Sequence, residues 1–207
     1  VVPASGNVVI NGTYGTLTIN STGAYSYSSK ALNADGTDNF TYTLKDYDGD
    51  TDTAILSIQV QDGDTIPTII TPAADVVDET SLSSGTIVKT GSVVADFGDD
   101  GPGTIAGNNV FSASGSKLGG ALSSGGVPVV VSYANGVYTG KAGTQTVFTL
   151  SIGTDGSYTY RQFEQLDHAD GTNANDVITL NFGVVATDAD GDTASTTITV
   201  NVRDDAP

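Results

Sequence analysis

An internal repeat constrains this chain more than any other feature, because two copies of one pattern must fold into two versions of one structure. Tyr-Gly-Thr-Leu-Thr-Ile at residues 14–19 and Thr-Gly-Ala-Tyr-Ser-Tyr at 22–27 recur as Val-Phe-Thr-Leu-Ser-Ile and Asp-Gly-Ser-Tyr-Thr-Tyr at 147–160. Further along, the motif Asp-x-Asp-Gly-Asp-Thr begins at Asp46 and again at Asp188. The offset grows from 133 residues (Gly23 to Gly156) to 142 (Asp46 to Asp188), so the second copy has longer connections. We infer that one unit has been copied.

The boundary between the copies is predicted where Pro67 and Pro72 interrupt a short Thr- and Ile-rich stretch. We therefore expect one unit at residues 1–67 and a second at residues 68–207. The first copy contains only what corresponds to the C-terminal half of the second. It is either a smaller sandwich or one half of a domain whose other strands lie elsewhere in a longer chain.

Alternation of apolar and polar residues predicts strands in both copies. Phe40, Tyr42 and Leu44 alternate with polar residues, and Ile198, Val200 and Val202 do the same near the C-terminus. This period of two is the signature of a half-buried strand. Turns rich in Gly, Asn and Asp separate the runs, and no stretch has a helical period, so we predict an all-β fold of antiparallel β-sandwiches.

The charge balance decides which partners are plausible. The chain has 24 acidic and 7 basic residues, a formal net charge of −17, and no Cys, Met or Trp. Such a surface repels nucleic acid and anionic membranes but attracts cations. No apolar run is long enough to cross a bilayer, and without Cys no disulfide can hold the fold together. We therefore expect no nucleic-acid partner and no membrane insertion, and we expect core packing and metal ions to hold the fold together.

The two Asp-x-Asp-Gly-Asp motifs are the strongest candidate metal sites. Calcium takes six to eight oxygen ligands, and alternate Asp residues around a tight Gly turn can direct several carboxylates inward. The sixth and twelfth positions from Asp46 are Thr51 and Ser57, so the loop is not an EF-hand. The alternative is that Asp and Gly simply make good turns. The calcium hypothesis names the following ligands: Asp46, Asp48 and Asp50, and Asp188, Asp190 and Asp192.

A second acidic group lies around the boundary between the units. Asp62 and Asp64 leave the first copy, and Asp78 and Glu79 follow shortly after the second begins, together with Asp75. Asp204 is the counterpart of Asp62 at the acidic exit of the second copy. These residues could form an interdomain calcium site that straightens the linker, or a solvated and flexible acidic linker.

Catalytic motifs are not evident. His168 is the only histidine, Cys is absent, and no Gly-x-Ser-x-Gly motif is present. A lone histidine beside carboxylates could act as a base or a ligand, but we expect His168 to cap a turn. We predict that the protein is not an enzyme.

With these residues in view, the chain resembles the repeat domains of giant RTX adhesins, which Gram-negative bacteria export by type I secretion. The resemblance rests on the stretches from Val147 to Tyr160, on Leu166-Asp167-His168, and on the strand and Asp motif from Phe182 to Ala194. It implies tandem immunoglobulin-like sandwiches with calcium at their junctions, export as an unfolded chain, and folding outside the cell in calcium. It also implies a role in adhesion and biofilm formation, with neighbouring domains of the same chain as partners. Carried over residue by residue, it implies the same calcium ligands in the two Asp motifs, with Asp62, Asp78 and Glu79 at the junction.

Two functions remain open at this point. The first is a stalk segment, made rigid by calcium, which holds a distal binding domain away from the cell. The second is a module that itself binds a peptide or glycan, through a site associated with calcium. A hollow lined by tyrosines beside an ion would favour the second function.

Overall fold

The structure is a computed structural model, and it describes residues 6–30, 35–63, 65–115, 120–170, 172–173 and 175–205. Nearly all regular structure in these residues is antiparallel β-sheet, which confirms the all-β prediction. The chain divides into two compact units between Thr65 and Ile66, two residues before the predicted start of the second unit. Residues 99–101 group with the first unit.

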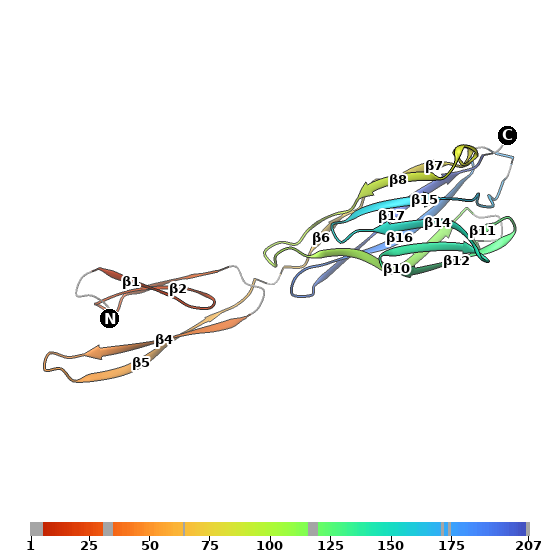
Figure 1. Cartoon of the computed structure of the whole chain (residues 1–207). Helices are drawn as coiled ribbons and strands as arrows, with labels where there is room; N and C mark the ends of the chain where they lie inside the picture. Colours follow the sequence, from red (N-terminus) through yellow and green to blue (C-terminus); the bar gives the residue numbers. More distant parts are fainter. Residues whose placement is uncertain are drawn as a thin grey trace. The chain divides into compact units, whose positions relative to one another are not determined.

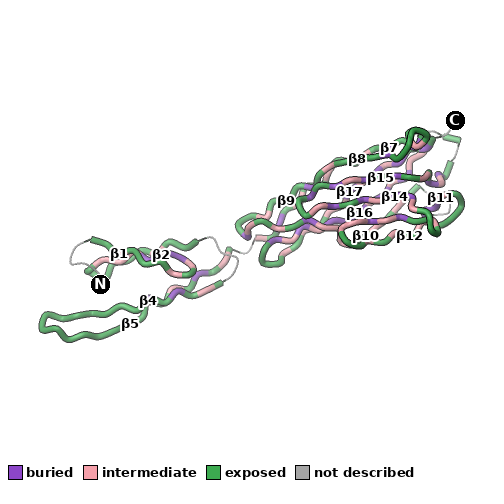
Figure 2. Tube along the Cα trace, viewed as in Figure 1, coloured by how far each residue is buried: buried purple, intermediate pink, exposed green. Residues whose placement is uncertain are grey.

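The first unit contains five strands in two small antiparallel sheets (Figure 1). Strands β1, β2 and β3 form one sheet in that order, and β4 pairs with β5 in the other. Their bounds are β1 Asn7–Asn11, β2 Gly15–Asn20, β3 Tyr25–Ser29, β4 Gly36–Lys45 and β5 Thr51–Val60. Buried apolar residues are few, namely Leu17, Phe40 and Val60, and most of β4 and β5 is exposed (Figure 2).

The second unit is a sandwich of two larger sheets. One has the order β10-β16-β17-β7 and the other the order β11-β12-β13-β14-β15-β8, while β6 and β9 form a separate two-stranded ribbon. The strands of the first sheet and the ribbon are β10 Thr104–Ser114, β16 Val177–Thr187, β17 Thr193–Arg203, β7 Asp75–Asp78, β6 Thr68–Ile70 and β9 Val94–Asp96. The strands of the second sheet are β11 Ser123–Ser124, β12 Val127–Ala134, β13 Val137–Ala142, β14 Gln145–Ile152, β15 Ser157–Gln162 and β8 Ile87–Ser92.

Aromatic side chains fill the space between these two sheets. Phe182 of β16 lies at the centre, with ring centroids 5.3 Å from Phe111, 5.4 Å from Tyr138 and 5.8 Å from Phe148. Every second residue of β16 from Ile178 to Ala186 is fully buried. So are Ile198, Val200 and Val202 of β17, whose alternation predicted a strand. The one described helix, η1 (Glu79–Ser84), is a single short 3-10 segment, and no described helix could span a bilayer.

The repeat in the sequence is also a repeat in structure. The β4–β5 hairpin pairs Lys45 with Thr51 across its loop, and the β16–β17 hairpin pairs Thr187 with Thr193 at the equivalent place. Among the described residues of the first unit, however, no strand occupies the positions that β10 and β7 hold beside β16 and β17. The first unit therefore corresponds to the later strands of the second.

One parallel pairing places residues that are far apart in sequence at the same end of the second unit. Strand β7 runs beside β17 (Figure 1), and the two are parallel, with Asp78 opposite Arg203. Glu79 and Asp204 therefore follow the paired strands at one pole. The loop of residues 188–192 lies at the other end of β17. The unit thus has two poles that both contain acidic residues.

Candidate metal centres

The loop from Asp188 to Asp192 is closed by its own first residue. The Asp188 N–H donates to the Asp192 carbonyl oxygen at 3.1 Å. In return, Asp188 Oδ1 accepts hydrogen bonds from the N–H groups of Gly191 at 3.0 Å and Asp192 at 2.7 Å. Gly191 has φ +113°, a backbone conformation that residues with a Cβ rarely adopt. The sequence therefore produces a tight, self-capped hairpin loop here.

The carboxylates of this loop converge. One oxygen from each of Asp188, Asp190 and Asp192 lies within 4.8 Å of the other two. Asp188 is 6% exposed, and its second oxygen, Oδ2, is buried without a hydrogen-bond partner. A buried carboxylate oxygen without a partner is costly, because the charge has lost its water. A cation held by the three carboxylates would remove this cost.

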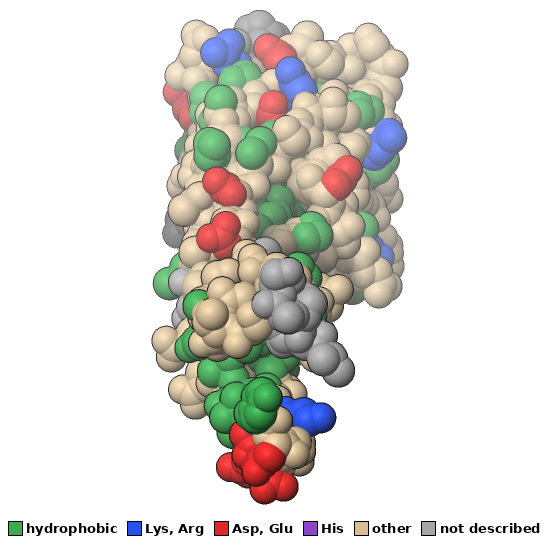
Figure 3. Space-filling view, turned by 90° about the vertical axis from the view of Figure 1, so that its left-hand side faces the viewer, with side chains coloured by type: hydrophobic (Ala, Val, Ile, Leu, Met, Phe, Trp, Pro, Cys, Tyr) green, Lys and Arg blue, Asp and Glu red, His purple; other side chains and the backbone are tan. Residues whose placement is uncertain are grey.

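The equivalent loop of the first unit has the same backbone but a different environment. The Asp46 N–H donates to Asp50 O at 3.0 Å, Gly49 N–H donates to Asp46 Oδ1 at 3.0 Å, and Gly49 has φ +108°. The oxygens of Asp46, Asp48 and Asp50 also lie within 4.8 Å of one another, yet all three residues are exposed. In Figure 3 acidic side chains (red) gather at the tip of this hairpin. The contact with the Asp48 carboxyl, and then backbone N–H groups including that of Gly49, lower the pKa of Asp46 despite some desolvation.

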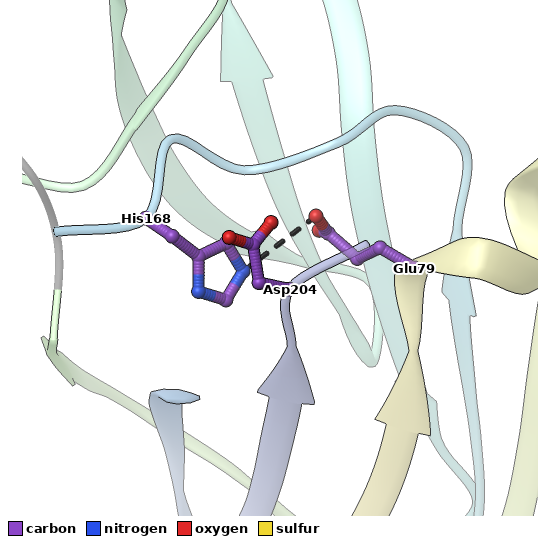
Figure 4. Close-up of side chains that lie close together, drawn as sticks. All are labelled: Glu79, His168 and Asp204. Carbon is purple, nitrogen blue, oxygen red and sulfur yellow. Dashed lines mark ion pairs between the residues drawn. The ribbon is translucent and has the colours of Figure 1, made fainter. Parts of the chain in front are cut away.

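A third cluster lies inside the second unit, where β7 and β17 end. Glu79, His168 and Asp204 are 1%, 3% and 7% exposed, and one ligand atom from each lies within 4.8 Å of the others. Glu79 begins η1, Asp204 follows β17, and His168 belongs to the connection between β15 and β16. Figure 4 shows the three side chains pointing toward one another.

Each carboxylate of this cluster has one oxygen held by a donor and one oxygen without a partner. Glu79 Oε1 accepts hydrogen bonds from the Leu166 N–H at 2.8 Å and from the Gln162 side-chain amide. Asp204 Oδ1 accepts from the Asp205 N–H at 2.9 Å. Glu79 Oε2, Asp204 Oδ2 and both ring nitrogens of His168 are buried without hydrogen-bond partners.

The electrostatics of the cluster follow from its burial. His168 Nε2 lies 3.6 Å from Glu79 Oε2, too far for a hydrogen bond. Burial alone would lower the pKa of His168, but the neighbouring Glu79 carboxylate, followed by Asp204 and Asp176, outweighs burial and raises the pKa. Burial and the charge of Glu79 also raise the pKa of Tyr160 well above its ordinary value. The neutral Tyr160 hydroxyl donates to Gln162 Oε1 at 3.0 Å, and this bond orients the amide that reaches Glu79.

The prediction that His168 caps a turn was wrong. A capping side chain needs a hydrogen bond to the backbone, and neither nitrogen of His168 has one in the described part of the chain. The tripeptide Leu166-Asp167-His168 does shape the loop, but through other groups. Asp167 carboxylate oxygens accept the N–H groups of Gly125 and Gly126 at 3.0 and 2.8 Å.

The residues of the predicted junction group have different hydrogen-bond partners in the structure. Asp78 caps η1, accepting the Thr80 N–H at 3.0 Å, and Asp75 accepts the Tyr158 hydroxyl at 2.8 Å. Strand β7 carries the chain along the sheet from the entry of the second unit before Glu79 is reached, and a role for Glu79 in an interdomain site stays a prediction. Asp62 belongs to the first unit, where its N–H donates to Asp35 Oδ1 at 2.8 Å, and Asp64 lies outside the described residues.

Sequence reasoning named Glu79 and Asp204 separately and did not bring them together with His168. Only the parallel register of β7 on β17 joins Glu79 to Asp204, and a sequence pattern does not reveal a pairing between strands more than a hundred residues apart. The available signal was the lone histidine within an acidic segment, and we interpreted this histidine as a turn cap.

Comparison with known families divides the chain in a similar way. Residues 75–201 match the family described as "Domain of unknown function (DUF5801)", and residues 3–59 match the family described as "Bacterial Ig domain". No curated protein matches the chain.

Proposed function

The chain belongs to the family described as "Domain of unknown function (DUF5801)", and from this membership and the bacterial Ig domain before it we propose a structural role at the bacterial surface. In this role the chain is a stalk segment of an adhesin, and calcium makes its immunoglobulin-like units rigid. Bacterial Ig-like domains are usually extracellular, and their sandwiches are typically not enzymes. Both tendencies fit a segment with a structural role and without catalytic activity.

The observation that carries the calcium proposal is the pair of equivalent Asp loops. Two hairpins at the same place in two units close with the same hydrogen bonds, and each directs three carboxylates to within 4.8 Å. Turn formation alone explains Asp188 Oδ1, which accepts two N–H groups. It does not explain why Asp188 Oδ2 is buried without a partner. A hard cation, which takes oxygen ligands, would be the partner of that oxygen.

Calcium would then couple folding to location. Extracellular calcium modules bind with Kd of roughly 0.1–1 mM, so such sites fill outside a cell and empty inside it. The net charge of −17 makes this coupling strong, because the compact chain repels itself unless cations bind. The resemblance to RTX adhesins supports the finer proposal that the chain is exported unfolded by type I secretion and folds on meeting calcium. Such a segment would serve adhesion and biofilm formation.

Two hollows among the described residues give no support to the alternative, a module that binds a peptide or glycan. One hollow of about 570 Å³ in the first unit is lined by residues 10–13 and 37–41. Another of about 320 Å³ in the second unit is lined by residues 92–95, 97, 103, 105 and 154–155. Neither of these two hollows is lined by a tyrosine or by the Asp loops.

Thermal unfolding of the whole chain tests the proposal. Each site filled at about 100 times its Kd adds about 2.7 kcal/mol to the free energy of unfolding. For a chain of this size, 1 kcal/mol corresponds to about 2–4 °C in the midpoint. We expect calcium to raise the midpoint by about 10 °C or more relative to EDTA, and magnesium at the same concentration to raise it far less. Identical midpoints in calcium and EDTA would contradict the proposal and leave the Asp loops as ordinary turns.

A further inference from the structure

We propose that Glu79, His168 and Asp204 form a binding site for one divalent transition-metal ion of the zinc type, separate from the Asp loops. The site goes beyond the calcium proposal and does not depend on it. It uses a different donor set, and it lies at the opposite end of β17 from the loop of residues 188–192.

The spacing of the donor atoms fits a zinc ion better than an ion pair. Zinc binds imidazole nitrogen at about 2.0–2.1 Å and carboxylate oxygen at about 2.0–2.2 Å in tetrahedral geometry, which separates two ligand atoms by about 3.3–3.5 Å. His168 Nε2 and Glu79 Oε2 are 3.6 Å apart. A protonated imidazole paired with a carboxylate would instead approach to about 2.7–2.9 Å. The separation is close to that of two ligands sharing an ion.

Hydrogen-bond donors already hold the two carboxylates of the site in place. Leu166 N–H and the Gln162 amide hold Glu79 Oε1, and Asp205 N–H holds Asp204 Oδ1. Each carboxylate is therefore fixed in orientation while its other oxygen is left for a ligand role. Donors of this kind commonly orient metal ligands and raise their affinity.

Charge balance also favours a divalent ion. Two buried carboxylates and a protonated imidazole leave one uncompensated negative charge in a site that is less than 10% exposed. Two carboxylates and a neutral imidazole around a divalent cation sum to zero, which lowers the cost of burial. The same arrangement would give a use to three of the four buried polar atoms that lack hydrogen bonds, namely Glu79 Oε2, Asp204 Oδ2 and one of the two ring nitrogens.

The imidazole distinguishes this site from the Asp loops. Calcium and magnesium take oxygen ligands, whereas imidazole suits zinc and its neighbours in the transition series. With three protein ligands, a fourth tetrahedral position would be left for water. The bound ion would join the end of β7, the end of β17 and the β15–β16 connection at one point.

Metal content measured in the presence of calcium tests the proposal. The whole chain is stripped with EDTA, returned to millimolar calcium to fill the Asp loops, and titrated with Zn²⁺ by calorimetry, with the bound metal counted by mass spectrometry. We expect one zinc ion per chain that millimolar calcium does not displace. His168→Leu removes a ligand, so it should weaken zinc binding by more than the roughly 10–100-fold that loss of a ligand's hydrogen-bond partner costs. The matched control, Asp188→Asn at the other pole, should leave zinc binding unchanged.

Cobalt substitution keeps the test decisive if His168→Leu folds poorly. Co²⁺ bound to one nitrogen and several oxygens in tetrahedral geometry gives intense visible absorption bands, whereas six-coordinate Co²⁺ on carboxylates does not. We expect these bands in the wild type and in Asp188→Asn, and their loss in the near-isosteric Asp204→Asn. The proposal is overturned if the wild type binds no zinc in calcium, if His168→Leu binds zinc as the wild type does, or if Asp188→Asn removes the binding. A failure of the calcium melt with intact zinc binding would overturn the proposed function alone.

Discussion

The β4–β5 hairpin of the first unit and the β16–β17 hairpin of the second share a strand pattern and a loop but not an environment. Phe182 is fully buried and its counterpart Phe40 is 8% exposed, so the centres of the two hairpins are alike. Toward the loop they differ, because Val184 is fully buried whereas its counterpart Tyr42 is 40% exposed and Leu44 is 64% exposed. Alternation therefore determines which face of a strand is apolar, while neighbouring strands decide how far that face is buried.

The second unit shows which neighbouring strands the β4–β5 hairpin lacks among the described residues of the first unit. Strand β10 pairs along β16 and brings Phe111 against Phe182, and β7 pairs with the end of β17. The first unit also contains a buried carboxylate, Asp38, at the position that corresponds to Leu180. Asp38 is satisfied by Thr13 N–H at 2.8 Å, Tyr14 N–H at 3.1 Å and the Tyr27 hydroxyl at 2.7 Å. A polar contact in the first unit thus replaces an apolar one in the second.

The largest expected effect comes from removing the central phenylalanine of each hairpin. Phe182→Ala should cost about 3–5 kcal/mol, because a fully buried ring surrounded by aromatic side chains leaves a cavity. Phe40→Ala should cost clearly less, since among the described rings only Tyr27 packs against Phe40, with centroids 6.3 Å apart. Hydrogen exchange followed by mass spectrometry reports each unit separately.

Phe182→Leu is the matched control, because it keeps an apolar side chain and should retain most of the stability. Equal losses of protection for Phe40→Ala and Phe182→Ala would show that the two hairpins are covered to the same extent, contrary to the burial in the structure.

The second-largest effect is expected from asparagine substitution in the two Asp loops. Asp188→Asn keeps the shape and the N–H contacts but removes a buried charge, and it should abolish about 2.7 kcal/mol of stabilisation at a calcium concentration 100 times the Kd. Asp46→Asn should remove less, because the exposed loop is screened by water and holds its carboxylates less firmly. Calcium-dependent melts of both variants measure the difference, and a larger effect at Asp46 would reverse our ranking of the two sites.

A titration at alkaline pH compares two tyrosine–carboxylate pairs, one in each unit. Burial raises the pKa of Tyr27 to about 12, and the hydrogen bond to Asp38 and the charge of Asp38 add to this rise. Burial, followed by the hydrogen bond to Asp75 and its charge, raises the pKa of Tyr158 to about 12 as well. The folded chain holds these protons more tightly than the unfolded chain, whose tyrosines titrate near 10. Their contribution to stability is therefore complete below pH 10 and is lost as the pH rises from 10 to 12.

Tyr27→Phe and Tyr158→Phe should each remove one late-titrating phenol from the tyrosinate absorbance. Each should also flatten the fall of the melting midpoint between pH 10 and 12. A variant that leaves both curves unchanged would show that its tyrosine titrates as an exposed one.

The smallest effect is expected in the turns between β2 and β3 and between β14 and β15. Asn20 Oδ1 accepts from Thr22 N–H, Thr22 Oγ1 and Ala24 N–H, whereas Asp155 Oδ1 accepts only from the N–H and hydroxyl of Ser157. Asn20→Ala should cost about 0.5–1.5 kcal/mol in the first unit, the net value of an exposed hydrogen bond or two. Chemical denaturation measures it, with Thr18→Ala on the neighbouring strand as the control.

Much of the fold could be predicted because its signals are local. The alternation along β4 and β17 and the tight turn at Asp188 each depend on residues within a dozen positions of one another, and the repeat shows the same local signals twice. The cluster at Glu79 could not be predicted in the same way. It depends on a parallel pairing between β7 and β17 and on a connection that buries His168 against both. The sequence shows the residue types of Glu79, His168 and Asp204. Their proximity depends on the pairing of strands, which the sequence does not show.

The parallel pairing of β7 with β17 has a consequence for a chain that is pulled from its ends. The chain enters β7 at one end of the ladder and leaves β17 at the other, so tension between the two ends of this unit acts along the strands. The ladder from Asp75–Val200 to Asp78–Arg203 is then loaded in shear, and its hydrogen bonds must break together rather than unzip one after another. An ion bound by Glu79 and Asp204 would fasten the far end of that ladder. The unit would yield to tension only after both had failed.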